Sequence, residues 1–280
     1  MGIGLILEGG GMRGVYTAGV LDFFLDKGIL LDNCFGVSAG ACHACSYLAG
    51  QRGRAFATAV DYLGDKRYCS LHSLITTGDM FGAEMLYETI PKELYPIDNA
   101  SFLKNTAVFQ AVVTNCETGK AEYPVIKDLL RDIGYVRASS SLPLVSRIVK
   151  IGGKPYLDGG IADSIPVRQS VLQGNLKNVV VLTRHRQYRK GENKLMPLLK
   201  MKYKAYPKLV ESLQSRHIRY NETLEYIAGE EQKGNLFVIA PQEPLGLSRV
   251  EKNREKLQKA YETGYADARR SFSAVKGFIS

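Results

Sequence analysis

The stretch Gly36-Val37-Ser38-Ala39-Gly40 lies between a short apolar run, Cys34–Val37, and an Ala-rich segment over residues 39–50. The apolar run predicts a buried strand, and the Ala-rich segment predicts a helix. A G-x-S-x-G pattern between a strand and a helix is typical of a nucleophile elbow, a sharp turn that exposes a serine hydroxyl. The alternative is a glycine-rich turn in which Ser38 only caps the helix.

A second glycine-rich turn, Glu8-Gly9-Gly10-Gly11-Met12-Arg13-Gly14, follows the apolar run Ile3–Leu7 and opens a predicted helix over 13–27. It satisfies the dinucleotide pattern G-x-G-x-x-G, which also needs an acidic residue at the end of the second strand. Asp32 precedes that strand, so the pattern does not favour a dinucleotide site. The remaining interpretations are a structural turn or an oxyanion hole, in which backbone N–H groups of Gly10 and Gly11 bind a developing negative charge.

The rest of the chain alternates between predicted strands and helices. Strands are predicted at 107–114, 121–126, 179–182 and 236–239, a hairpin at 147–157, and long polar helices at 207–231 and 248–273. This order predicts an α/β fold of three layers, with a mostly parallel central sheet flanked by helices. No repeat or linker divides the chain. We therefore expect one domain over 1–280, with the motifs in 1–185 and a helical C-terminal part over 200–280.

An activated serine needs a base. Asp158, in Tyr156-Leu157-Asp158-Gly159-Gly160, ends a predicted strand, and the two glycines would hold its carboxylate rigidly; an ordinary Asp-Gly turn is the alternative. His185 is the rival base, because the order Ser38, Asp158, His185 is that of the α/β-hydrolase triad. His43 lies about one and a half helical turns beyond Ser38 and should point away from its hydroxyl.

Together, the motifs at 9–14, 36–40 and 158–160, with the segment Ile161–Pro166, resemble the patatin-like phospholipase family. The resemblance covers about residues 1–50 and 135–185. It implies a patatin-like fold, Ser38 as nucleophile, Asp158 as base, and an oxyanion hole at Gly10 and Gly11 with Arg13 beside it. It implies no metal or other cofactor. The glycines that support the motifs are Gly9, Gly14, Gly36, Gly40, Gly159 and Gly160. Glu8 departs from the family, in which many members have Asp there.

The function implied by the resemblance is a serine acyl hydrolase, acting on a lipid or another acyl ester through an acyl-enzyme. Acyl transfer or thioester hydrolysis on the same dyad is an alternative, as is a catalytically weak protein that binds anionic lipid. Aspartate has an ordinary pKa of about 3.9. Its use as a base therefore calls for an apolar, partly desolvated site that raises this value.

The positive charge is concentrated in one segment. The chain has 37 Lys and Arg against 28 Asp and Glu, a net charge of +9, and residues 184–208 hold nine of the basic residues but only one acidic residue. Apolar residues interleave with these cations, so we expect a peripheral contact between 184–208 and an anionic membrane. A solvated basic face is the alternative, and no nucleic acid is expected because no recognisable module presents the charge.

The composition and the cysteines suggest a cytoplasmic location, with any membrane contact at the inner face. No apolar run reaches about 18 residues. The N-terminus lacks the basic region of a signal peptide, and five scattered cysteines favour free thiols. Cys42 and Cys45 are expected to be core residues rather than metal ligands. The apolar segment 78–96 is interpreted as core, lid or acyl groove, and the oligomeric state is left open.

Overall fold

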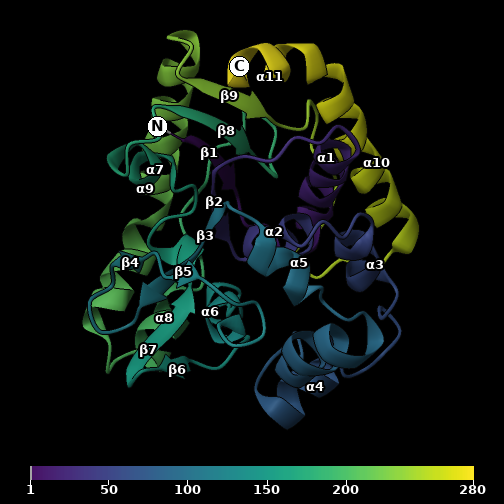
Figure 1. Ribbon diagram of the computed structural model, residues 1–280. Coiled ribbons are helices and arrows are strands. Elements are labelled where there is room, and N and C mark those ends of the chain that lie inside the picture. The colour runs from purple at the N-terminus through teal and green to yellow at the C-terminus, as the bar shows by residue number, and fades with distance from the viewer. Residues whose placement is uncertain (1) are drawn as a thin grey trace.

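The computed structural model describes residues 2–280 and is built around one mixed sheet with the order β6-β7-β3-β2-β1-β8-β9 (Figure 1). Five strands are parallel: β1 (Ile3–Leu7), β2 (Asn33–Val37), β3 (Val108–Asn115), β8 (Lys177–Val181) and β9 (Leu236–Ile239). Four pair antiparallel at one side: β4 (Ala121–Glu122), β5 (Val125–Ile126), β6 (Val149–Ile151) and β7 (Lys154–Asp158). The predicted mostly parallel α/β sheet is confirmed.

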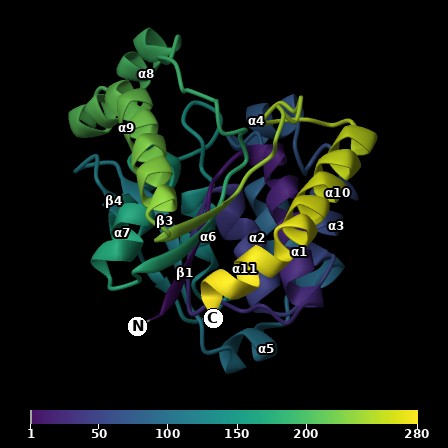
Figure 2. The same ribbon diagram turned by 90° about the horizontal axis from the view of Figure 1, so that it is seen from above.

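Helices cover both faces of the sheet, which gives the three predicted layers (Figure 2). Side chains alternate along β1: Leu5 and Leu7 join the core under α1 and α2, whereas Ile6 joins the core under α9. The α-helices are α1 (Val15–Asp26), α2 (Ala39–Leu48), α3 (Arg54–Val60), α4 (Leu71–Thr77), α5 (Asn99–Lys104), α6 (Ile133–Ser139), α7 (Val167–Leu172), α8 (Met196–Lys202), α9 (Pro207–Gln232), α10 (Arg254–Arg270) and α11 (Phe272–Ile279). Two 3₁₀ turns, η1 (Gly11–Gly14) and η3 (Gly159–Ile161), and a π-helix, η2 (Met85–Leu94), complete the chain.

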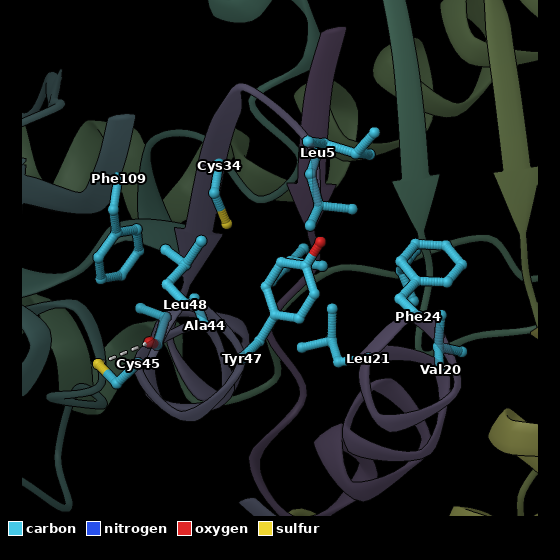
Figure 3. Packing of buried hydrophobic residues seen from close by; sticks show 14 of the residues in the cluster. Leu5, Val20, Leu21, Phe24, Cys34, Ala44, Cys45, Tyr47, Leu48 and Phe109 are labelled. Atoms are coloured by element: carbon cyan, nitrogen blue, oxygen red, sulfur yellow. Dashed lines mark hydrogen bonds between the residues drawn. The ribbon is translucent and has the colours of Figure 1, made fainter. Parts of the chain in front are cut away.

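The largest core lies between the sheet and α1 and α2 (Figure 3). Tyr47 is buried there, and its hydroxyl donates a hydrogen bond to the carbonyl of Ile29 (2.9 Å), which satisfies the one polar atom of the ring. Cys34 and Cys45 pack in the same core, and burial raises the pKa of both thiols. Cys45 is therefore a small core residue, as expected. Cys42 is only partly buried.

Three predicted elements differ from the structure. The strand predicted at 121–126 is two short strands, β4 and β5, because Pro124 between them has no N–H to donate. The helix predicted at 248–273 begins only at Arg254, where the Asn253 side chain accepts a hydrogen bond from the N–H of Lys256, and it breaks before α11. The part 200–280 is not wholly helical, because β9 leaves it to pair with β8.

The C-terminal helix α10 packs along α1, and the two lie side by side in Figure 2. Two glycines allow this close approach. A Cβ atom built on Gly19 of α1 would lie 2.0 Å from the carbonyl oxygen of Tyr261, and one on Gly264 of α10 would lie 2.0 Å from that of Tyr16. The Tyr16 hydroxyl also donates to Asp267 (2.8 Å). These contacts fix α10 to the first helix of the fold.

Substituting Gly19→Ala should therefore lower the free energy of unfolding by about 1–3 kcal/mol, because the helices must separate to admit the methyl group. Gly229→Ala is the matched control. It also lies in a helix, but its added Cβ meets nothing within 4 Å, so it should be neutral or stabilising. Chemical denaturation of both variants measures the difference. Equal stability of the two variants would contradict the close packing of α1 and α10.

Candidate active site

The sheet register brings Ser38 and Asp158 to the same level. Val37, the last residue of β2, pairs with Val112 of β3, and Asp158, the last residue of β7, pairs with Val113 of β3. Ser38 follows Val37 directly, so β3 lies between the two residues, with neighbouring strands about 4.8 Å apart. Because β7 runs antiparallel to β2 and β3, the chain enters Asp158 from the opposite direction to that in which it enters Ser38.

Ser38 occupies a strained turn between β2 and α2, with φ 55° and ψ −123°. Among residues 2–280, Leu144 is the only other non-glycine residue with a positive φ. The N–H of Ser38 donates to the hydroxyl oxygen of Ser139, at the end of α6 (2.9 Å). Both residues are buried, so this bond satisfies a donor that water does not reach. The geometry is that of the predicted nucleophile elbow.

Asp158 is held by its backbone and by one carboxylate oxygen. Its N–H donates to the carbonyl of Ser141 (2.9 Å), and its own carbonyl accepts a hydrogen bond from the Thr114 hydroxyl (2.9 Å). Oδ1 accepts from the N–H of Gly160 (2.8 Å). Oδ2 is enclosed and has no hydrogen-bond partner among residues 2–280. One acceptor oxygen of the buried carboxylate is therefore still available.

Burial raises the pKa of Asp158 above its ordinary value, and the charge of Arg216 and the nearby Ser38 hydroxyl act in the opposite direction. A Cβ built on Gly160 would lie 3.0 Å from both Asp158 Oδ1 and Arg216 Nη2, so the guanidinium and the carboxylate flank the same glycine. The charge of Arg216 therefore favours the ionised carboxylate in a site whose burial favours the neutral acid.

The glycine-rich turn after β1 lies against the serine. A Cβ built on Gly9 would lie 2.8 Å from Ser38 Cβ. The N–H of Met12 donates to the carbonyl of Arg249 (3.1 Å). Outside the helices and strands, no backbone carbonyl of the described chain accepts the N–H of Gly10 or Gly11. Both glycines line the same cavity as Ser38.

Two cavities meet at Ser38. The first is polar, with a volume of about 30 Å³, and its walls include Gly9, Gly10, Gly11, Arg13, Ser38, Asp158 and Gly160. The second is apolar, with a volume of about 110 Å³, and is lined by Met12, Val15, Ala59, Phe81, Leu86 and Tyr87, among others. The structure therefore brings the predicted dyad and oxyanion residues together. Gly14, Gly36, Gly40 and Gly159 do not line the polar cavity; they lie behind it, each within 3 Å of a neighbouring residue if given a Cβ.

Neither candidate histidine lines the polar cavity. The Nδ1 atom of His185 lies 3.2 Å from the side-chain oxygen of Gln187, outside both cavities. His43 is buried beside the apolar cavity, and burial lowers its pKa to about 4, so its imidazole is neutral at pH 7. Two acids, Glu8 and Asp158, line the polar cavity together with Ser38.

Glu8 forms part of the cavity wall, and both of its carboxylate oxygens accept hydrogen bonds from neighbouring residues. Its carboxylate accepts hydrogen bonds from the N–H (2.7 Å) and hydroxyl (3.0 Å) of Thr183 and from the hydroxyl of Tyr220 (2.6 Å). These bonds join the ends of β1 and β8 to α9. Glu8, which stands where many members of the family have Asp, therefore has a structural role in the wall of the cavity.

Sequence reasoning missed several residues around the site. Ser139 and Arg249 carry no local motif, because only the fold brings them to the cavity. Arg216 had a signal, because it continues at helical spacing the stripe of buried residues on α9, although it is itself only half-buried. The buried residues of that stripe are Leu209, Leu213, Tyr220, Leu224 and Ile227. A cation on the inward stripe of a helix is unusual.

Segment 184–208 divides into an inner and an outer part. Arg184 and Lys190 line the polar cavity, and Arg186 and Lys208 pair with Glu231 and Glu211. The outer part is exposed: Lys194, Leu195, Leu198, Lys200, Met201, Lys202 and Lys204. Leu199 and Tyr203 anchor α8, and the Tyr203 hydroxyl accepts a hydrogen bond from the N–H of Leu144 (3.1 Å).

Segment 78–96 supplies both a small core and a cavity wall. Met85 and Ile90 are buried in a separate cluster with Tyr68 and Cys69. Phe81, Leu86 and Tyr87 line the apolar cavity. The segment therefore belongs in part to the core and in part to the wall of the apolar cavity.

A family model described as patatin-like phospholipase matches residues 5–171. The chain belongs to this family. A second model, a domain of unknown function, matches residues 206–280. A patatin-like phospholipase is expected to be a lipid acyl hydrolase.

An uncharacterised protein, YjjU, of Escherichia coli is 26% identical over 277 residues, which cover 94% of this chain and 74% of the relative. An uncharacterised NTE family protein of Mycobacterium bovis is 25% identical over 178 residues, which cover 59% of this chain and only 27% of the relative. The crystal structure of VipD from Legionella pneumophila matches with 13% identity and a TM-score of 0.49, covering 98% of this chain and 67% of that chain.

Two observations bear on ligands and membranes. No group of three or more His, Cys, Asp or Glu side chains in residues 2–280 is arranged to hold a metal ion. Within the same residues, no helix is long and apolar enough to cross a membrane.

Substituting Ser139→Ala should lower the free energy of unfolding by about 1–3 kcal/mol, because the buried N–H of Ser38 loses its acceptor. Ser140→Ala is the control. Its hydroxyl contacts the Val136 carbonyl and Cys42 Sγ, and no backbone N–H depends on it. Thermal and denaturant unfolding of the two variants tests the difference. A Ser140→Ala variant as unstable as Ser139→Ala would contradict the proposed importance of the elbow bond.

Proposed function

We propose that this chain is a serine acyl hydrolase that uses a Ser38–Asp158 dyad through an acyl-enzyme intermediate. The observation that carries the proposal is the position of Ser38 between a polar and an apolar cavity. An acyl chain in the apolar cavity places its ester carbonyl at Ser38, and the alcohol part then occupies the polar cavity. This arrangement fits an amphiphilic acyl ester.

In the first step, Ser38 Oγ attacks the acyl carbonyl while Asp158 takes its proton. The N–H groups of Gly10 and Gly11 stabilise the oxyanion, and the charge of Arg13 adds positive potential. Collapse of this intermediate breaks the ester bond, and Asp158 returns the proton to the leaving alcohol. In the second step, Asp158 takes a proton from water, which attacks the carbonyl of the acyl-enzyme. The bond between the acyl group and Ser38 Oγ then breaks, Asp158 returns the proton to Ser38 Oγ, and the fatty acid is released.

The protonation state of Asp158 sets the pH dependence of this cycle. The base must be ionised, so activity rises with pH as the carboxyl loses its proton. Because burial raises the pKa of Asp158, the rise should lie above the ordinary aspartate range. Acyl transfer to another alcohol, or thioester hydrolysis, would use the same dyad with a different acceptor or leaving group.

Ser38→Ala and Asp158→Asn should each lower turnover of a short p-nitrophenyl ester by at least about a hundredfold, because nucleophile or base is lost. A fluorophosphonate probe should label wild type at Ser38. His185→Ala is the control and should retain wild-type activity, since its ring lies outside the cavity. Retained activity in Asp158→Asn together with loss in His185→Ala would overturn the dyad and make His185 the base.

We further propose that the exposed part of α8 contacts an anionic membrane. Leu195, Leu198 and Met201 are exposed by 54%, 43% and 67%, and they stand among four lysines that form no ion pair within residues 2–280. Such a surface combines insertion of apolar side chains with attraction to acidic headgroups. Its anchor, Tyr203, bonds Leu144, two residues from Leu142 in the walls of both cavities.

Reversing Lys200, Lys202 and Lys204 to Glu should weaken binding to anionic vesicles by a factor on the order of a hundred, at about 1 kcal/mol per cation. Turnover of a soluble ester should not change. The matched control reverses three exposed lysines on other elements, Lys104, Lys127 and Lys150. Vesicle co-sedimentation measures binding. Equal weakening by both triple variants would show that total charge, not this surface, is responsible.

A further inference from the structure

The polar cavity is lined by more positive charge than its acids balance. Five cationic side chains contribute to its walls: Arg13, Arg184, Lys190, Arg216 and Arg249. The acids are Glu8 and Asp158, and the carboxylate of Glu8 is already bonded to Thr183 and Tyr220. The formal charge of the lining groups is therefore +3.

None of these five cations has a salt bridge or a side-chain hydrogen bond to another group within residues 2–280. The surface ion pairs of the chain all use other residues. The Nε atoms of Arg13 and Arg216 are fully enclosed without a partner. Buried polar groups are normally hydrogen-bonded, so donors left free at one cavity indicate a ligand that satisfies them.

The crowding affects the titration of the cations. Burial, together with the charges of Arg216, Arg249 and Arg13 and against the effect of Glu8, lowers the pKa of Lys190 to about 7. Burial also lowers the pKa of Arg216, with Arg249 acting in the same direction. Lys190, Arg216 and Arg249 thus repel one another across a shared space, and an anion between them would relieve this repulsion.

The C-terminal segment supplies two of these three cations. Arg216 lies on α9, and Arg249 lies in the loop before α10, so both fall within the domain of unknown function at 206–280. The carbonyl of Arg249 accepts the N–H of Met12 in the glycine-rich turn, and α10 is packed along α1. The segment is therefore part of the wall beside Ser38.

We propose that residues 206–280 complete the active site, and that Lys190, Arg216 and Arg249 form a subsite for a phosphate group of the substrate. This inference rests on the proposed function, since it places the phosphate on the alcohol side of an ester at Ser38. Guanidinium groups match phosphate oxygens with paired donors, and a phosphate monoester brings close to two negative charges.

The same geometry discriminates between headgroups. A phosphate monoester offsets most of the +3 lining charge, whereas a phosphocholine group would place a quaternary ammonium near unpaired arginines. A neutral glycerol brings no negative charge to these three cations. The preferred substrate is therefore an acyl glycerol with a terminal phosphate, and phosphocholine and phosphate-free esters of equal chain length should be poorer substrates.

Hydrolysis of water-soluble dihexanoyl lipids below their micellar concentration tests the preference without a membrane surface. Wild type should show a higher kcat/KM for dihexanoyl glycerol phosphate than for dihexanoyl phosphocholine or dihexanoylglycerol. Arg249→Gln, at the exposed mouth of the cavity, should reduce that selectivity by about tenfold or more, the usual effect of losing a charged hydrogen bond. Lys252→Gln removes a cation from the same loop outside the cavity and should retain the selectivity.

Calorimetry with inorganic phosphate at pH 8 tests the subsite without catalysis. Phosphate should bind wild type with uptake of a proton, because a bound anion raises the pKa of Lys190 from about 7. The affinity should fall in Arg249→Gln, and proton uptake should disappear in Lys190→Met. Absence of phosphate binding to wild type would overturn the subsite.

The outcomes separate this inference from the proposed function. If wild type cleaves p-nitrophenyl butyrate and dihexanoyl esters without preferring the phosphate-bearing one, the substrate assignment is wrong and the hydrolase stands. Phosphate binding without that preference assigns the subsite to free phosphate and also overturns the substrate class. If no ester is cleaved, the hydrolase is wrong, and the calorimetry alone decides whether the phosphate subsite exists.

Discussion

The active centre depends on the backbone of Ser38, which adopts a φ of 55° that a residue with a Cβ seldom takes. Such strain persists only where the surroundings hold it. Here the buried hydroxyl of Ser139 accepts the N–H of Ser38, and two residues later the carbonyl of Ser141 accepts the N–H of Asp158. One short piece of chain at the end of α6 therefore fixes Ser38 and Asp158 together. The strand β3 sets their separation, and α6 and its following turn set their orientation.

The second constraint is electrostatic. Burial raises the pKa of Asp158, and the charge of Arg216 acts in the opposite direction. Arg216 does so from a helix that follows the family match at 5–171. The carboxylate of Asp158 is therefore coupled to the C-terminal segment through charge. The close packing of α10 on α1 holds that segment against the rest of the fold.

The local parts of the site could be predicted from the sequence, because each is a short turn between a strand and a helix. The spacing of glycines predicts the turns at Ser38, at Asp158 and after the first strand. An apolar run predicts the strand Leu236–Ile239. Ser139 could not be found, since a serine that supports a distant N–H looks like any other serine. Arg249 lies in a polar loop that offers no periodicity. Arg216 could have been found from its place on the buried stripe of α9. It was missed because the helix was described only as polar, without separating its buried stripe from its exposed side.

The distribution of charge then gains a different meaning. The excess in 184–208 suggested one basic surface, but its cations face two directions. Arg184 and Lys190 face the cavity, where Arg216 and Arg249 join them from elsewhere in the chain, and the lysines of α8 face outward. An amphiphilic acyl ester with an anionic headgroup would meet positive charge twice, first at the surface and then beside Ser38. Net charge alone cannot separate these roles, because attraction to a surface acts over about a Debye length while recognition requires direct hydrogen bonds. The fold separates them by turning the same segment inward before α8 and outward along it.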